Sequence, residues 1–126
     1  MISVFYDDRC KICSKEINFY KKIAPKNSLK WLGISSSNLD LKLANIKLVD
    51  ALLYLHVRDS EGNFYIGVDA FIVIWKKLPY FKYLNLIISL PIIYQLAKYL
   101  YKKFAKYRFN KLKHCQIAFE EEKKKQ

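Results

Sequence analysis

The sequence predicts a single α/β domain with a central four-stranded mixed sheet, the element order β-α-β-α-β-β-α-α and an extra C-terminal helix. Three observations lead to this prediction. The chain has 126 residues, 52% of them hydrophobic, which is enough for one buried core and too apolar for a disordered chain. A β-rich run at residues 2–6 changes to helical spacing from Ile12. Further on, an acidic turn with a glycine separates two strand-like runs.

The opening of the chain predicts a β-α-β unit. Residues 2–6 form the first strand, and a polar loop follows at residues 7–11. Apolar side chains then share one helical face until Pro25 ends the helix: Cys13, Ile17, Tyr20 and Ala24. Residues 29–34 predict the second strand.

The middle of the chain predicts a helix, a buried hairpin and another helix. Residues 39–48 have a weak helical pattern, and residues 51–57 are apolar at nearly every position, which favours a strand buried on both faces. Residues 59–63 predict a turn and residues 64–66 its returning strand. Asp69 is a suitable N-cap for a helix that ends at Pro79. This order is the arrangement of a thioredoxin-like domain, predicted over residues 1–113, with a charged C-terminal tail at residues 114–126.

The last third of the chain is strongly basic. The net charge is +12, and residues 76–119 contain ten basic and no acidic residues. A helix beginning at Pro91 is expected to bury Ile93, Ala97, Leu100 and Phe104 and to expose Lys98, Lys102 and Lys106. The basic surface either solubilises the protein or makes a weak contact, through residues 76–113, with an anionic membrane or an acidic protein. No specific nucleic-acid binding is predicted.

A C-x-x-C motif, Cys10-Lys11-Ile12-Cys13, lies at the start of the first helix. The helix N-terminus favours a thiolate at Cys10, which makes Cys10 a candidate nucleophile, and Cys13, expected to be more buried, a candidate resolving thiol. A zinc site completed by His114 and Cys115 is a less favoured alternative, because adjacent ligands are unusual. Otherwise these two residues are expected to be incidental, the last residues frayed, and His56 a core histidine.

The chain resembles the DCC family of predicted thiol-disulfide oxidoreductases. Tyr6-Asp7-x-x-Cys10-x-x-Cys13 is similar to the D-x-x-C-x-x-C signature of that family. Residues 59–70, Trp75-Lys76-Lys77-Leu78-Pro79 and residues 101–109 are similar to its later motifs. Asp8 is a departure, because the family usually has glycine there; an aspartate tolerates the left-handed backbone that such a glycine can adopt.

The resemblance implies an enzyme that exchanges thiols and disulfides. Cys10, Cys13 and Asp7 are the expected catalytic residues; Asp7 either fixes the loop by accepting amide hydrogen bonds or transfers a proton. The substrate would be a protein or low-molecular-weight thiol or disulfide, with no cofactor and no metal. The alternative is a non-enzymatic basic module that binds a membrane surface or an acidic partner. Without a basic leader and with an odd number of cysteines, the expected location is the cytoplasm.

Overall fold

A four-stranded mixed sheet forms the centre of the protein. The computed structural model describes residues 2–25, 28–36, 38–79 and 81–125. The strands are β1 (Ile2–Tyr6), β2 (Leu29–Gly33), β3 (His56–Arg58) and β4 (Phe64–Ile66). Their order is β2-β1-β3-β4; β1 is parallel to β2 and antiparallel to β3, and β4 returns antiparallel to β3. The predicted four-stranded mixed sheet is therefore confirmed.

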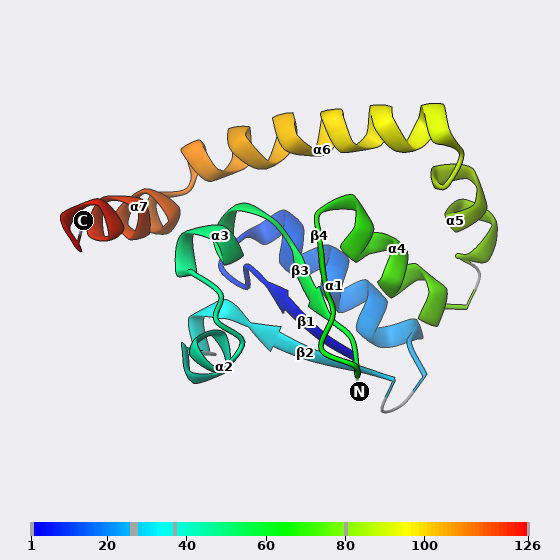
Figure 1. Ribbon diagram of the computed structural model, residues 1–126, viewed down its shortest axis with the longest axis horizontal. Coiled ribbons are helices and arrows are strands. Elements are labelled where there is room, and N and C mark those ends of the chain that lie inside the picture. Colours follow the sequence, from blue (N-terminus) through cyan, green and yellow to red (C-terminus); the bar gives the residue numbers. More distant parts are fainter. Residues whose placement is uncertain (1, 26–27, 37, 80, 126) are drawn as a thin grey trace.

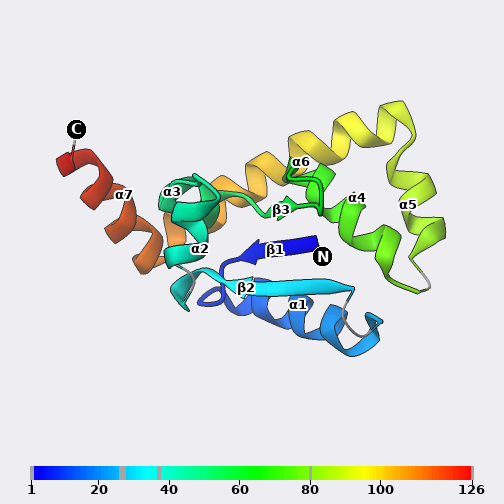
Figure 2. The same ribbon diagram turned by 60° about the horizontal axis from the view of Figure 1, so that its bottom comes forward.

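Seven α-helices and one 3-10 turn surround this sheet in the described ranges (Figures 1 and 2). Helix α1 (Lys11–Ile23) joins β1 to β2, and the 3-10 turn η1 (Ile34–Ser36) follows β2. Two short helices lead to β3, and four further helices follow β4. Their bounds are α2 (Asn38–Leu43), α3 (Leu48–Leu53), α4 (Val68–Lys77), α5 (Lys82–Ile88), α6 (Pro91–Lys111) and α7 (Lys113–Lys125).

The core has two parts because side chains alternate across β1. Val4 packs with α1 and α4 residues such as Ile17 and Ile74. Phe5 points to the opposite face and packs with Leu52 of α3 and Phe109 of α6. Strand β1 therefore contributes side chains to both parts of the core.

The predicted strand at residues 51–57 is wrong in its first half. Residues 48–53 form helix α3, and only His56–Arg58 are a strand. An all-apolar run fits a buried helix as well as a buried strand, so spacing alone does not distinguish them. Ala51 and Leu52 are buried in the Phe5 part of the core, and His56 is buried as expected.

The predicted helix at residues 39–48 ends early, because α2 stops at Leu43 and a break separates it from α3, which begins at Leu48. Asn45 has a left-handed backbone with φ of 60°. The amide of Ile46 donates to the Leu41 carbonyl and that of Asn45 to the Lys42 carbonyl, at 2.9 and 3.1 Å. This is the Schellman pattern that ends helices, and asparagine is one of the few residues that tolerates its conformation.

Helix α6 is rotated relative to the prediction. Lys102 and Lys106 are exposed as expected, but Lys98 is only partly exposed. Ile93 and Ala97 are partly rather than fully buried, and Leu100 and Phe104 are 55% and 43% exposed. The buried face instead contains Ala105, Arg108 and Phe109. Polar contacts of α6, described below, set this rotation, and they outweigh the local apolar pattern.

The C-terminal residues are a helix and not a frayed tail. Helix α7 places Cys115 and Ala118 in the core, in the same cluster as Phe109. Figure 1 shows α6 running along the long axis of the molecule, with α5 at one end and α7 at the other. The helix α5 was not predicted, because the apolar run around it carries no distinct helical face.

Within the described residues, no single helix has both the length and the apolar composition needed to cross a membrane. Helices α5 and α6, which meet at a bend of 91°, pass that test of length and composition only when they are taken together.

Candidate active site

The C-x-x-C motif lies where β1 passes into α1, as predicted. Cys10 is the N-cap of α1, with the extended backbone (φ −87°, ψ 120°) that an N-cap requires. Its Sγ accepts a hydrogen bond from the Cys13 amide at 3.5 Å. The Cys10 amide donates to the Asp7 carbonyl at 3.2 Å, which closes the loop. The Cys10 sulfur thus lies at the positive end of the helix dipole.

The burial of the two thiols is the reverse of the prediction. Cys10 is 2% exposed, whereas Cys13 is partly exposed and lines a cavity. The cap position places Cys10 under the rest of the loop, while Cys13, one turn later, faces outward from α1 toward α6. Cys13, and not Cys10, is therefore the more exposed of the two thiols.

The Cys13 thiol holds its proton at neutral pH. Burial, with a smaller contribution from the hydrogen bond with Cys10, raises the pKa of Cys13 to about 12. Arg108 opposes this shift, because its positive charge favours the thiolate. Arg108 is close enough to interact with both sulfurs.

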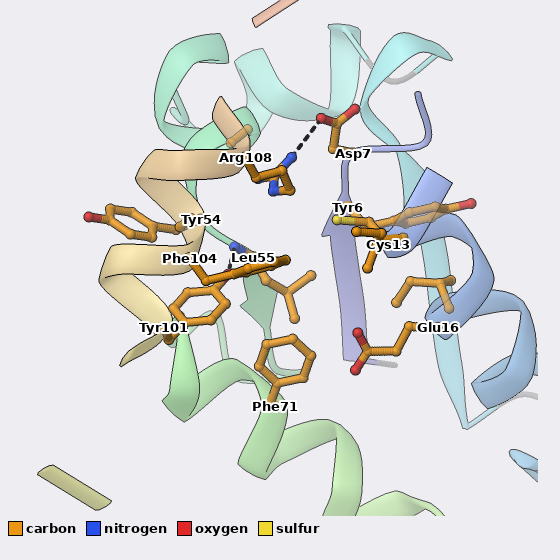
Figure 3. Close-up of a pocket in the computed structure, with 14 residues that line it drawn as sticks. Tyr6, Asp7, Cys13, Glu16, Tyr54, Leu55, Phe71, Tyr101, Phe104 and Arg108 are labelled. Carbon is orange, nitrogen blue, oxygen red and sulfur yellow. Dashed lines mark hydrogen bonds and ion pairs between the residues drawn. The ribbon is translucent and has the colours of Figure 1, made fainter. Parts of the chain in front are cut away.

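Arg108 connects the loop to α6 and α3. Its Nη1 donates to Oδ2 of Asp7 at 3.0 Å (Figure 3), and its Nη2 donates to the Leu52 carbonyl at 2.5 Å. Nη2 also reaches the Leu53 carbonyl at 3.3 Å. These carbonyls belong to the last turn of α3, which has no intrahelical donors for them. One guanidinium thus satisfies a buried carboxylate and a helix C-terminus.

Asp7 is the point at which the buried polar groups meet. It is a buried side chain at the end of β1. Besides Arg108, His114 lies with Nε2 2.9 Å from both carboxylate oxygens, and the Arg9 amide donates to Oδ1 at 3.1 Å. The Cys115 thiol contacts Oδ2 at 3.7 Å. The last contact and the burial of Cys115 raise the pKa of that thiol to about 12, burial being the larger cause.

The prediction that His114 and Cys115 are incidental is wrong, since both contact Asp7. Asp7, His114 and Cys115 offer ligand atoms within 4.8 Å of one another, and this is the one such group in the described part of the chain. It differs from the four-ligand zinc site left open by the sequence, because Cys10 and Cys13 are not in it. The Arg108 guanidinium on the same carboxylate disfavours a dication there.

A cavity of about 50 Å³ lies between α1 and α6 (Figure 3). Cys13 and Glu16 line it from α1, Tyr101, Phe104 and Arg108 from α6, and Leu55 from the segment before β3. The Tyr101 hydroxyl accepts a hydrogen bond from the Leu55 amide at 2.9 Å. That bond satisfies a backbone donor at the cavity wall and fixes the rotation of α6.

Asp8 replaces the family's usual glycine without needing a left-handed backbone. Among the described residues, Asn45 is the one non-glycine residue with positive φ. The Ser35 amide donates to Oδ1 of Asp8 at 3.0 Å, and the Ser35 hydroxyl donates to Oδ2. Partial burial on its own raises the pKa of Asp8, but these hydrogen bonds outweigh it and lower the pKa below its usual value. The loop is thereby attached to η1.

Gly33 provides the space that this attachment needs. A Cβ at position 33 would lie 2.9 Å from Cγ of Asp8 and 3.0 Å from its Oδ2. Contacts this short do not occur between well-packed atoms, so a larger residue would displace the Asp8 side chain and its bonds to Ser35.

Arg108 was expected only as part of the family-like motif at residues 101–109, and its place in the site was not predicted. It is the one arginine among the ten basic residues of positions 76–119. Arginine differs from lysine in that its planar guanidinium binds two acceptors at once, which suits a buried site. That difference was the available signal. His114 had no comparable local signal.

Comparison with known protein families matches residues 4–114 to the DCC1-like thiol-disulfide oxidoreductase family. The match covers most of the chain, including both cysteines of the motif, Asp7 and Arg108. The chain therefore belongs to this family, as its motifs predicted. No curated protein and no solved structure matches the sequence.

Proposed function

We propose that this protein is a thioredoxin-like thiol-disulfide oxidoreductase whose redox pair is Cys10 and Cys13. The observation that carries the proposal is the Cys10 Sγ, which caps α1 and accepts the Cys13 amide at 3.5 Å. The fold assignment is supported by the strand order β2-β1-β3-β4, with the motif between the first strand and first helix. Family membership supports the reaction class.

Cys10 is the proposed nucleophile despite its burial. With a pKa of about 12, Cys13 has a thiolate fraction of about 10⁻⁵ at pH 7. A more basic thiolate is intrinsically more nucleophilic, which offsets part of the loss in thiolate fraction. Cys13 should still attack a disulfide about a hundredfold more slowly than an ordinary thiol at about pH 7. Because Cys10 is buried, its side chain must rotate to present the sulfur to a substrate. The position of the Cys10 sulfur, which caps α1 at the positive end of the helix dipole, supports Cys10 as the nucleophile.

The proposed reaction is a two-step exchange. The Cys10 thiolate attacks one sulfur of a substrate disulfide, forms a mixed disulfide and releases the other sulfur as a thiolate. Cys13 then loses its proton to solvent, attacks the Cys10 sulfur and releases the second substrate thiolate. Two electrons pass from the protein to the substrate, and a second thiol pair returns the protein to its reduced form. The same steps in reverse would oxidise a substrate.

Asp7 is proposed as a positioning residue rather than a proton carrier. Arg108, His114 and the Arg9 amide all contact its carboxylate, and these contacts hold the loop to α6 and α7. Through Arg108 it holds a positive charge beside both sulfurs. This supports the sequence-based interpretation in which Asp7 fixes the loop.

The proposed substrates are proteins or small molecules that carry thiols or disulfides, and the exchange itself requires no metal or organic cofactor. A reducing compartment, the cytoplasm, is proposed because an odd number of cysteines argues against structural disulfides.

Trapping experiments test the assignment of roles. The Cys13→Ser variant, treated with a disulfide substrate, is expected to accumulate a mixed disulfide at Cys10, detected by peptide mass spectrometry. The Cys10→Ser variant is expected to accumulate none, and Cys115→Ser serves as the matched control with both site thiols intact. Trapping at Cys13 in the Cys10→Ser variant would show that exposure, and not charge, selects the nucleophile.

Redox equilibration tests the reaction class against the alternative of a non-enzymatic basic module. In graded glutathione, the wild type is expected to lose two hydrogens, both within the Cys10–Cys13 peptide. A potential near about −270 mV would indicate a reductant and one near about −120 mV an oxidant. If the protein formed no such disulfide at any ratio of reduced to oxidised glutathione, only the alternative of a non-enzymatic basic module would remain.

A further inference from the structure

Helix α6 has a second apolar face, opposite the face that packs on the core. Its core face contains Ala105, Arg108 and Phe109. The outward face carries five large side chains at helical spacing, each more than half exposed: Ile92, Leu96, Tyr99, Leu100 and Tyr107. Ile92, at 84% exposure, contacts almost nothing. A helix that needed only to solubilise the protein would not carry this stripe.

Helix α5 extends the apolar surface around the bend. Four of its side chains or those next to it are also more than half exposed: Tyr83, Leu86, Ile87 and Leu90. In Figures 1 and 2 no other element covers the outer side of α6 in the described part of the chain. We call these two sets of residues together the outer α5–α6 face.

The segment that carries the outer α5–α6 face is rich in lysine and has no acidic residue of its own. Residues 76–119 hold ten basic residues and no acidic one. The ammonium groups of Lys103 and Lys111 lie 5.4 and 5.1 Å from the ring centroids of Tyr99 and Tyr107. Lysine and tyrosine both combine an apolar body with a polar tip, which is the chemistry of a membrane interface.

We propose that the outer α5–α6 face binds the surface of a bilayer that contains anionic lipids, with α6 lying parallel to the membrane plane. The exposed apolar side chains would enter the boundary between headgroups and acyl chains, and the lysines would contact the lipid phosphates. The charge of the face complements an anionic surface. This inference rests on the surface alone and does not depend on the redox chemistry.

Two other occupants fit less well. In a symmetric dimer the face would meet its own copy, so that lysines would oppose lysines. An acidic protein would satisfy the lysines but would need an apolar surface of its own to cover the nine exposed apolar and aromatic side chains of the face. A bilayer offers both kinds of contact continuously.

The membrane-bound orientation would bring the candidate active site close to the bilayer. Phe104 lines the Cys13 cavity and is partly exposed beside the outward stripe, while Tyr101 and Arg108 reach the cavity from the other side of the same helix. The cavity and the lipid surface would thus share one helix as a wall.

Vesicle sedimentation tests the proposal. The full-length protein is expected to pellet with vesicles of phosphatidylcholine and phosphatidylglycerol and far less with phosphatidylcholine alone. The triple variant Lys102→Glu, Lys103→Glu, Lys106→Glu should lose at least about a hundredfold in partition, since each lysine near the surface contributes about fivefold. High salt should also weaken the binding of the wild-type protein to these vesicles, because it screens the lysine charges.

A matched control separates this face from net charge. The triple variant Lys22→Glu, Lys30→Glu, Lys42→Glu changes the total charge equally at exposed positions outside α5 and α6. Its partition into the vesicles should stay within about threefold of the wild type.

A second set of variants tests the apolar part of the face. The triple variant Ile92→Ser, Leu96→Ser, Leu100→Ser should lose at least about tenfold in partition into the vesicles. The control Leu43→Ser, Phe64→Ser, Ile117→Ser, also at exposed sites, should not. Circular dichroism checks that each variant is folded.

A tryptophan probe tests the depth of the contact. Leu96→Trp should be quenched by nitroxide-labelled lipid, whereas Leu43→Trp should not. Equal losses in the two lysine variants, quenching at neither position, or binding to polyglutamate with none to vesicles would each overturn the proposal; the last result would assign the face to an acidic protein. Concentration-dependent dimerisation abolished by the serine variant would assign it to a second copy.

Discussion

Arg108 and Asp7 form a buried ion pair between residues 101 positions apart in the chain, with Nη1 and Oδ2 separated by 3.0 Å. The pair attaches α6 to the loop that carries the C-x-x-C motif. It also determines which charge lies beside the two sulfurs, because Arg108 interacts with both. A contact that maintains the tertiary fold therefore also sets the electrostatics of the candidate site.

Replacing Arg108 with methionine should lower the free energy of unfolding by about 3–5 kcal/mol, because Asp7 would remain buried with its main cation removed. Arg108→Lys should cost about 1–2 kcal/mol, since one ammonium does not reproduce the contacts with both Asp7 and the Leu52 carbonyl. Urea denaturation measures both. The control Lys106→Met, at an exposed position on the same helix, should stay within about 0.5 kcal/mol. A similar small effect of Arg108→Met would contradict the buried pair.

Gly33→Ala should cost about 1–3 kcal/mol, because the new Cβ would overlap the Asp8 side chain and break its bonds to Ser35. In an Asp8→Gly background the same substitution should cost markedly less, since the overlapping atoms are gone. A double-mutant cycle of unfolding free energies measures this coupling. Additive effects would mean that another neighbour of Gly33 causes the loss.

Cys13 should react slowly with iodoacetamide at neutral pH, about a hundredfold below an unperturbed thiol, because its pKa is about 12. Its rate should still rise with pH well above pH 9, the range in which an ordinary thiol has levelled off. Peptide-resolved mass spectrometry in the Cys115→Ser background follows Cys10 and Cys13 separately. A plateau for Cys13 near pH 9 would contradict the shifted pKa.

The pH dependence of stability should contain a contribution from His56. Burial lowers the pKa of His56 below its usual value of 6.5, although the hydrogen bond with the Tyr54 carbonyl opposes this. As the pH falls below 6.5, the unfolded chain takes up the proton before the folded protein does. Stability is therefore lost in that window, until the folded pKa is reached.

The His56→Gln variant should show a shallower loss of stability than the wild type between neutral pH and about pH 5. Urea denaturation across this range measures the difference, and the comparison removes contributions from groups that both chains share. Parallel curves for the two proteins would show that His56 titrates alike in the folded and unfolded states.

A chain that ends at Leu112 should lose at least about 2 kcal/mol of stability, because α7 buries Cys115 and Ala118 in the core. A chain that ends at Phe119 keeps both residues and His114, and loses only exposed contacts such as the 4.0 Å pair between Lys47 and Glu122. It should stay within about 1 kcal/mol of the full chain. Equal stability of the chain that ends at Leu112 would support the prediction that residues 114–126 are a tail separate from the domain.

Local features of the fold were predictable from the sequence, because they depend on neighbours in the chain. The first strand, the helix from Lys11 and the turn before β4 follow from spacing, Pro25 and Gly62, whose φ is 90°. The position of Cys10 at the helix start followed from the same spacing. The helix α3 did not, since a short apolar run has no period that separates helix from strand.

The tertiary structure decided which face of each helix is buried. The rotation of α6 depends on the Tyr101 bond to the Leu55 amide and the Arg108 bond to Asp7, and the latter joins residues more than a hundred positions apart. No local pattern encodes such pairs, and both sides of α6 are apolar, so either could have been buried. The sequence by itself determined where the thiols lie along the chain. Only the packing of α6 and α7 on the loop determined which thiol faces the cavity and which charges surround it.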